Sequence, residues 1–263
     1  LSCFHSFFNL LNTSVLVWFI PSIEKLVNKM VPANDEEEFR LKFIPTGLMS
    51  ASELSIEPAK KEIEAFSKRV VRMYEFIPDL FVEKDDKKFD YLMQRTKKYE
   101  EITDRMEVEI ANYLTKVSEN ELSLGASQEI SSMLRIVDNL ESIGDSCYQL
   151  SLAIESKKKQ NIWFTQDMRD KLQKMFSLVR EAVLEMNDNL SENYHSVRGE
   201  RAAEIEAKIN NYRDELRTEH TEAVKNNIYS YQTGICYSNL YAQCEKLADF
   251  AINITEAIVK TQQ

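Results

Sequence analysis

ISSMLRIVDNLESIGDSC, residues 130–147, decides the fold class. Its apolar residues Ile130, Met133, Val137 and Leu140 return every three or four positions. This period places them on one side of an α-helix, whereas a half-buried strand would show apolar residues at every second position. The stretch therefore predicts a helix with one buried face.

The same period extends in both directions from this stretch, and short polar breaks interrupt it. Gly125, Gly199 and Gly234 lie at or near three of these breaks, and glycine is common just beyond helix ends. The first break begins at Pro78. The pattern therefore predicts six helices, over residues 58–77, 86–118, 126–158, 165–195, 199–227 and 233–261.

Glycine and proline are scarce, which supports an all-helical chain. Each occurs five times in 263 residues, and no proline follows Pro78. Sandwiches, barrels and doubly wound sheets need many turns, which usually contain these two residues. Long helices joined by short loops are typical of antiparallel bundles. The 43% hydrophobic content also argues against disorder.

The net charge and the numbers and positions of cysteine, glycine and histidine exclude several classes of function. The net charge of −10 argues against a nucleic-acid partner. The four cysteines form no CxxC pair, so a reducing compartment is the simplest interpretation. The glycines are scattered and form no phosphate loop, and the three histidines suggest no nucleophile–base–acid set. We therefore expect no enzymatic activity.

An internal repeat relates the two halves of the helical region. Glu141 and Asp145 enclose a short apolar and small-residue segment, and Glu245 and Asp249 enclose a similar one. Acidic or amide residues with the same spacing occur on the preceding helix of each half, and the offset between halves is about 105–110 residues. We therefore predict two tandem antiparallel three-helix bundles, over residues 50–160 and 163–263.

Eight residues of this repeat are candidate metal ligands on the second and third helices of each bundle. Like charges four positions apart on a helix repel each other unless a cation compensates. The faces are therefore a metal site, a set of carboxyls with raised pKa values, or solvated helix surfaces. The candidates are Glu100, Asp104, Glu141, Asp145, Asn210, Asp214, Glu245 and Asp249.

The N-terminal region has a different character. Residues 1–22 are apolar and uncharged apart from His5, and about 20 such residues suffice to span a bilayer. We expect a membrane-spanning helix within residues 1–31 and a linker over residues 32–49, and a buried helix of a soluble domain is the alternative. The first residue is Leu1 rather than methionine, so we expect the chain to be a piece of a longer protein.

At the acidic pairs the sequence resembles the PhoU family, which consists of two tandem three-helix bundles with acidic signatures. The best matching stretch is CEKLADFAINITEAI, residues 244–258, with Asn253 and Glu256 after the acidic pair. Members with full signatures hold multinuclear iron or zinc clusters on this face. Here Ser146 and Phe250 replace the family's histidines, and Asn210 replaces a carboxylate. The resemblance therefore implies a weakly bound divalent cation or iron, and oxygen ligands suit Fe, Mg or Ca better than Zn.

HSFFNLLNT, residues 5–13, resembles the last membrane segment of bacterial Na+/phosphate cotransporters, in which a PhoU-like domain commonly follows the transport domain. This resemblance implies a cytosolic regulatory domain of a sodium-dependent phosphate transporter. It places the chain in the bacterial inner membrane, with residues 32–263 in the cytoplasm. The implied partners are the transport domain of the same chain, sodium and phosphate through that domain, and a second copy in a homodimer.

Two other functions stay open. One is a soluble PhoU-type regulator that binds a phosphate-transport ATPase or a sensor kinase. The other is a metal-dependent helical protein such as a di-iron carboxylate enzyme, which needs two Glu-x-x-His pairs on a four-helix bundle. The histidines supply one such pair, Glu192 and His195, which disfavours the enzyme.

Overall fold

Six α-helices make up the part of the chain that the structure describes. The structure is a computed structural model and describes residues 41–44, 53–192 and 194–261, among which there is no strand. The helices are α2 (Ile56–Val82), α3 (Asp86–Ser118), α4 (Leu124–Lys159), α5 (Gln166–Ser191), α6 (Glu200–Lys225) and α7 (Tyr231–Lys260). Two short 3-10 turns, η2 (Glu53–Ser55) and η3 (Tyr194–Ser196), precede α2 and α6. The expected six-helix, all-α fold is confirmed.

Helix α2 differs from its predicted end, because it continues through Pro78 to Val82. A proline inside a helix costs about 3 kcal/mol or more. Beyond it, Leu80 is buried and Phe81 packs edge-on against Phe176, with ring centroids 5.3 Å apart. Burying an apolar side chain of this size contributes about 1.5–3 kcal/mol. Buried Leu80 and partly buried Phe81 together offset most of the cost, and core packing overrides the local preference.

Side-chain caps fix the starts of four helices. Asp85, Ser123, Thr165 and Ser230 each accept a hydrogen bond from the backbone N–H three residues later, at 2.9–3.2 Å. Such a cap satisfies one of the N–H groups that a helix start leaves without a partner. The polar breaks in the sequence thus start α3, α4, α5 and α7.

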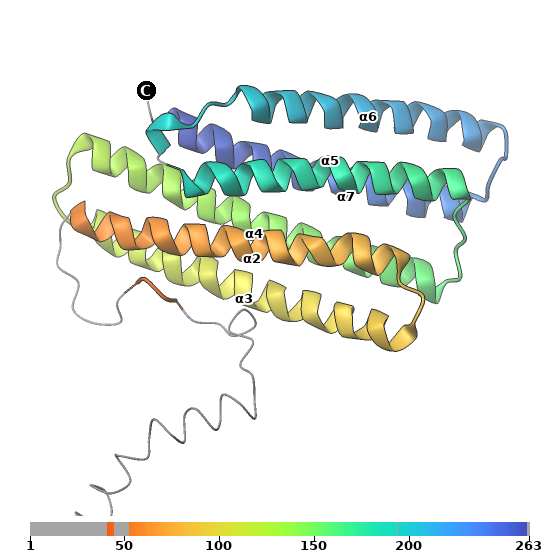
Figure 1. Ribbon diagram of the computed structural model, residues 1–263, viewed down its shortest axis with the longest axis horizontal. Helices are drawn as coiled ribbons and strands as arrows, with labels where there is room; N and C mark the ends of the chain where they lie inside the picture. The colour runs from red at the N-terminus through yellow and green to blue at the C-terminus, as the bar shows by residue number, and fades with distance from the viewer. Residues whose placement is uncertain (1–40, 45–52, 193, 262–263) are drawn as a thin grey trace, which may run out of the picture. The chain divides into compact units, whose positions relative to one another are not determined.

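The helices form two sets of three that pack on each other (Figure 1). Helices α2, α3 and α4 contact one another pairwise, and so do α5, α6 and α7. Helix α4 also packs along α7, and α2 along α5, so these four helices form the centre while α3 and α6 lie outside. The predicted boundaries at residues 160 and 163 stay a prediction, because both sets belong to one compact unit.

Buried polar contacts fix the register between the two sets. The Tyr74 hydroxyl of α2 donates to the Phe176 carbonyl of α5 at 2.6 Å. The Ser132 hydroxyl of α4 donates to the Ala257 carbonyl of α7 at the same distance. A buried polar group without a partner costs about 1–3 kcal/mol. These bonds therefore favour one alignment of the sets.

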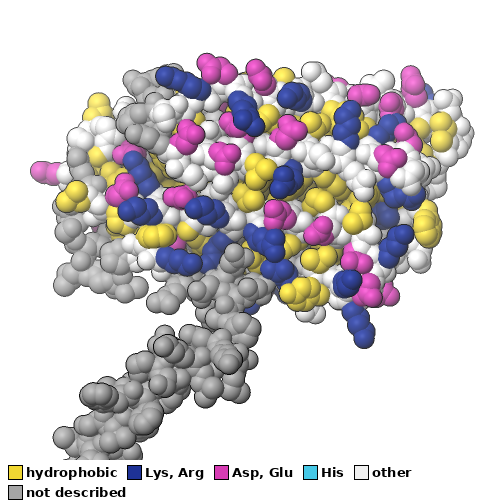
Figure 2. Space-filling view, in the orientation of Figure 1, with side chains coloured by type: hydrophobic (Ala, Val, Ile, Leu, Met, Phe, Trp, Pro, Cys, Tyr) yellow, Lys and Arg dark blue, Asp and Glu magenta, His cyan; other side chains and the backbone are white. Residues whose placement is uncertain are grey.

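The expected location in a bacterial inner membrane is wrong for the part of the chain that the structure describes. Within the described ranges, no helix is long and apolar enough to cross a bilayer. Charged side chains of both signs are spread over the helices, as the visible face shows (Figure 2). The predicted span over residues 1–31 lies outside the described residues, as does the predicted linker apart from residues 41–44.

Candidate functional site

The first acidic face lies where α3 and α4 come closest. A Cβ atom added to Gly144 of α4 would lie 2.8 Å from the Oγ1 atom of Thr103 on α3. Real Cβ contacts essentially never come so close, and Thr103 is buried, so only glycine permits this approach. The contact brings Asp104, next to Thr103, toward Asp145, next to Gly144.

Glu141 is the residue most affected by this arrangement. Its pKa is raised to about 7, first by partial burial and then by the negative charges of Glu107, Asp104 and Asp145. A hydrogen bond from the Ser142 hydroxyl acts in the opposite direction. Glu141 therefore exchanges protons near neutral pH.

The neighbouring carboxyls are also perturbed. Partial burial, followed by like charges, raises the pKa values of Glu100, Asp104 and Glu107. Asp145 contributes to the shifts of Glu100 and Asp104, and Asp138 to that of Glu107. The structure therefore brings all four predicted residues of this face together. It adds Glu107, which a search for acidic residues three positions from the pairs would have found, and Asp138, which the helical period already places on the side of Glu141 and Asp145.

The first face contains no paired cation within the described part of the chain, although the charge of Lys97 acts to lower the pKa of Glu100. No ion pair there joins Glu100, Asp104, Glu141 or Asp145 to a lysine or arginine. Nor do three or more of the described His, Cys, Asp and Glu side chains converge closely enough to hold a metal ion. The carboxylates lie close enough to repel one another, but the residues as placed do not fit a tight metal cluster.

The second acidic face, between α6 and α7, contains its own cation. The Nη1 atom of Arg213 donates to Oε1 of Glu245 at 2.6 Å, and its Nε atom lies 2.9 Å from Oδ1 of Asp214. The Arg213 side chain is 26% exposed and that of Glu245 is 21% exposed. Arg213 thus compensates two of the predicted ligands. The sequence signal was its place directly before Asp214, where Thr103 precedes Asp104.

An open cleft of about 420 Å³ lies along the second face. Burial, together with the charges of Glu245 and Glu206, raises the pKa of Asp249 to about 6, while Arg213 acts to lower it. Asp214 is not among the residues that line the cleft. The lining comprises Glu206, Asn210, Arg213, Glu245, Asp249, Ile252, Asn253 and Glu256.

The fold and these faces define a class: an all-helical protein of two packed three-helix sets, each with carboxyls between its second and third helices. Residues 63–154 match the family model described as the PhoU domain. The matched range covers most of α2, all of α3 and most of α4, and therefore contains the first acidic face. The predicted PhoU resemblance is confirmed over this range.

Two solved structures share the fold. The first is the phosphate transport system regulatory protein PhoU from Streptococcus pneumoniae, with 14% identity and a TM-score of 0.67, covering 80% of this chain and 96% of that one. The second is PhoU from Pseudomonas aeruginosa, with 14% identity and a TM-score of 0.71, covering 79% of this chain and 97% of that one. At this identity the likeness shows the fold alone. No curated protein matches the sequence, and these matches do not support the predicted cotransporter segment.

Proposed function

We propose that the chain is a PhoU-type regulator of phosphate transport that acts by binding other proteins rather than by catalysis. The observation that carries this proposal is the PhoU domain match over residues 63–154, the part of the chain that contains the first acidic face. The fold supports it, because it covers nearly the whole length of two solved PhoU chains. One of these chains is described as a regulatory protein of a phosphate transport system.

The partners in this proposal are components of a phosphate transport system. The link to a sodium-dependent transport domain of the same chain depended on residues 1–31, which lie outside the described residues. The regulator proposed here does not require that link. A homodimer, expected from the sequence, stays a prediction.

The first acidic face is the site that we assign to regulation by small ions. Its carboxyls repel one another, and a proton or a cation from solution relieves that repulsion. Because no three ligands converge among the described residues, we expect the face to take up a divalent cation or iron only weakly. The second face, with Arg213 already in place, binds such a cation less well than the first.

Complementation tests the function. The chain is expressed in a bacterium that lacks its own PhoU protein, and phosphate uptake is measured at high and low external phosphate. We expect restored repression of uptake at high phosphate. A variant with Glu100→Gln, Asp104→Asn, Glu141→Gln and Asp145→Asn should fold, by circular dichroism, and respond differently from the original chain. Unchanged uptake despite accumulation of folded protein would contradict the proposal.

A further inference from the structure

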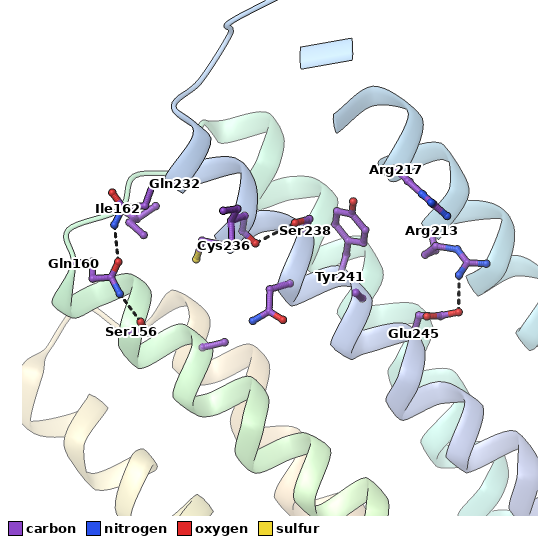
Figure 3. Close-up of a pocket in the computed structure, with 14 residues that line it drawn as sticks. Ser156, Gln160, Ile162, Arg213, Arg217, Gln232, Cys236, Ser238, Tyr241 and Glu245 are labelled. Atoms are coloured by element: carbon purple, nitrogen blue, oxygen red, sulfur yellow. Dashed lines mark hydrogen bonds and ion pairs between the residues drawn. The ribbon is translucent and has the colours of Figure 1, made fainter. Parts of the chain in front are cut away.

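A larger cleft adjoins the second face and shares Arg213 and Glu245 with the cleft described there. It has a volume of about 660 Å³ and is bordered by the end of α4, by α6 and by the first half of α7. Arg213 and Arg217 project from α6 toward the part of α7 that carries Tyr241 and Glu245 (Figure 3). Small-molecule sites typically have volumes of about 300–1,000 Å³. The cleft is thus large enough for an organic ligand.

The charge of this cleft is opposite to that of the whole chain. The protein has a net charge of −10, yet the lining of the cleft holds two arginines and one carboxylate, Glu245. That carboxylate already accepts a hydrogen bond from Arg213. The guanidinium of Arg217 makes no ion pair or hydrogen bond with any residue that the structure describes. Arg217 is therefore an exposed cation at the edge of the cleft, without a partner among the described residues.

The positive charges of Arg213 and Arg217 act on the hydroxyl of Tyr241. Its side chain is buried, which raises the pKa of the hydroxyl, and the charges of Arg217 and Arg213 act to lower it. The field of both guanidinium groups thus reaches the Tyr241 hydroxyl. Tyr241 lines the same cleft as both arginines, so an anion bound there would lie in the field of both guanidinium groups.

The rest of the cleft is uncharged, and polar side chains alternate there with apolar ones such as Ile162 and Ile235. The first half of α7, YQTGICYSNLYAQC over residues 231–244, contains no charged residue. The Gln232 amide donates to Oε1 of Gln160 at 2.6 Å, and the Gln160 amide donates to Oγ of Ser156 at 2.8 Å. The exposed Asn239 amide makes no side-chain hydrogen bond with another described residue. These amides offer both donors and acceptors to a neutral polar group.

We propose that this cleft binds a small organic phosphate ester, with its phosphoryl group at Arg217 and Arg213 and its neutral polar body along Asn239 and the two glutamines. Two guanidinium groups one helical turn apart match the double charge and three oxygens of a phosphoryl group better than the single charge of a carboxylate. A bare phosphate ion would leave most of the cleft empty. Nucleotides and sugar phosphates both have this chemistry.

Binding experiments with the whole chain distinguish a nucleotide from a sugar phosphate as the ligand. Isothermal titration is carried out with adenosine monophosphate, glucose 6-phosphate, adenosine, glucose and inorganic phosphate. We expect at least one ester to bind, at least tenfold more tightly than its parent without the phosphoryl group and than inorganic phosphate. Which ester binds identifies the source.

Variants place the ligand in the cleft. Arg217→Ala should weaken ester binding at least tenfold, whereas Arg135→Ala, which removes an exposed arginine of α4 outside the cleft, should leave it unchanged. Asn239→Ala should weaken binding of the ester more than binding of inorganic phosphate. Circular dichroism confirms that each variant is folded.

Three results would overturn the proposal. One is that neither ester binds at millimolar concentration, and another is that Arg217→Ala binds the ester as well as the original chain does. The third is equal binding of inorganic phosphate and both esters, which would identify a site for the free ion. None of these results bears on the phosphate uptake that tests the proposed regulatory function.

Discussion

The two acidic faces occupy equivalent places, between the second and third helices of each set, but their charges are balanced differently. In the first face, partial burial and then the surrounding carboxyls raise the pKa of Glu141 to about 7. In the second, Arg213 bonds to Glu245 and pairs with Asp214. The difference arises mainly where Thr103 of the first set corresponds to Arg213 of the second, and Asn210 in place of Glu100 removes a further negative charge. An acidic repeat therefore fixes where carboxyls gather, and the residue beside it decides whether they need a cation from solution.

The close contact of α3 with α4 is the feature whose loss should have the largest effect. Gly144→Leu places a side chain where Thr103 Oγ1 would be 2.8 Å from the added Cβ atom. We expect a loss of about 3 kcal/mol in the free energy of unfolding, because overpacking in a buried contact forces helices apart. Urea unfolding followed by circular dichroism measures it.

Gly125→Ala is the matched control, because no atom lies within 4 Å of the added Cβ. It should leave stability unchanged or raise it by about 1 kcal/mol through helix propensity. Equal stability of Gly144→Leu and the original chain would show that the helices do not approach as closely as described.

Removal of Arg213 should make the second face resemble the first. Arg213→Met leaves Glu245 without its hydrogen-bond donor and Asp214 without its ion pair. Because the pair is partly buried, the expected loss at pH 8 is about 2 kcal/mol, between the values for exposed and for buried pairs.

A double variant distinguishes lost pairing from lost packing. Adding Glu245→Gln to Arg213→Met should recover part of the stability, because one unpaired charge disappears. If the double variant is less stable than Arg213→Met alone, the contribution of Arg213 is packing rather than charge.

The pH dependence of stability should differ once Glu141 is neutralised. The pKa of Glu141 is raised in the folded state. Its stabilising contribution to the free energy of unfolding is therefore fully present below the ordinary pKa of 4.5 and is lost as pH rises through about 7. Glu141→Gln should therefore be more stable than the original chain at pH 8, by about 1 kcal/mol after allowance for solvent screening. The two should be nearly equal at pH 4.

Thermal melts from pH 4 to pH 9 check this difference. Asp249→Asn is the companion variant, because the pKa of Asp249 is raised to about 6. Its gain at pH 8 should be smaller, since Arg213 lies nearby. A Glu141→Gln variant with the same pH profile as the original chain would contradict the repulsion described for the first face.

Divalent cations should have the smallest effect. A cation at a concentration equal to its Kd stabilises the folded state by about 0.4 kcal/mol. We expect Mg²⁺ or Fe²⁺ at millimolar concentration to raise the melting temperature of the original chain slightly and to leave that of Glu141→Gln unchanged. A large shift at micromolar metal would reveal a tight cluster that the placement of these carboxyls does not fit.

Sequence patterns predicted the elements more reliably than the contacts between them. The apolar period found all six described helices, and the acidic repeat found the carboxyls of the first face, because both depend on spacing along one helix. The Thr103–Gly144 contact and the Arg213–Glu245 bond could not be predicted, because they depend on how two helices are aligned. The end predicted at Pro78 was wrong, since the burial of Leu80 depends on a partner from another helix.

The pKa of the Glu141 carboxyl, measured by NMR titration of the labelled side chain, tests the central claim most directly. We expect a pKa of about 7, because burial and three neighbouring carboxylates oppose the charge of Glu141. We further expect a lower pKa in Asp104→Asn, where one of those charges is gone. A pKa near the ordinary value of 4.5 in the original chain would show that the first face is solvated and uncoupled, and would remove the contrast with the second face.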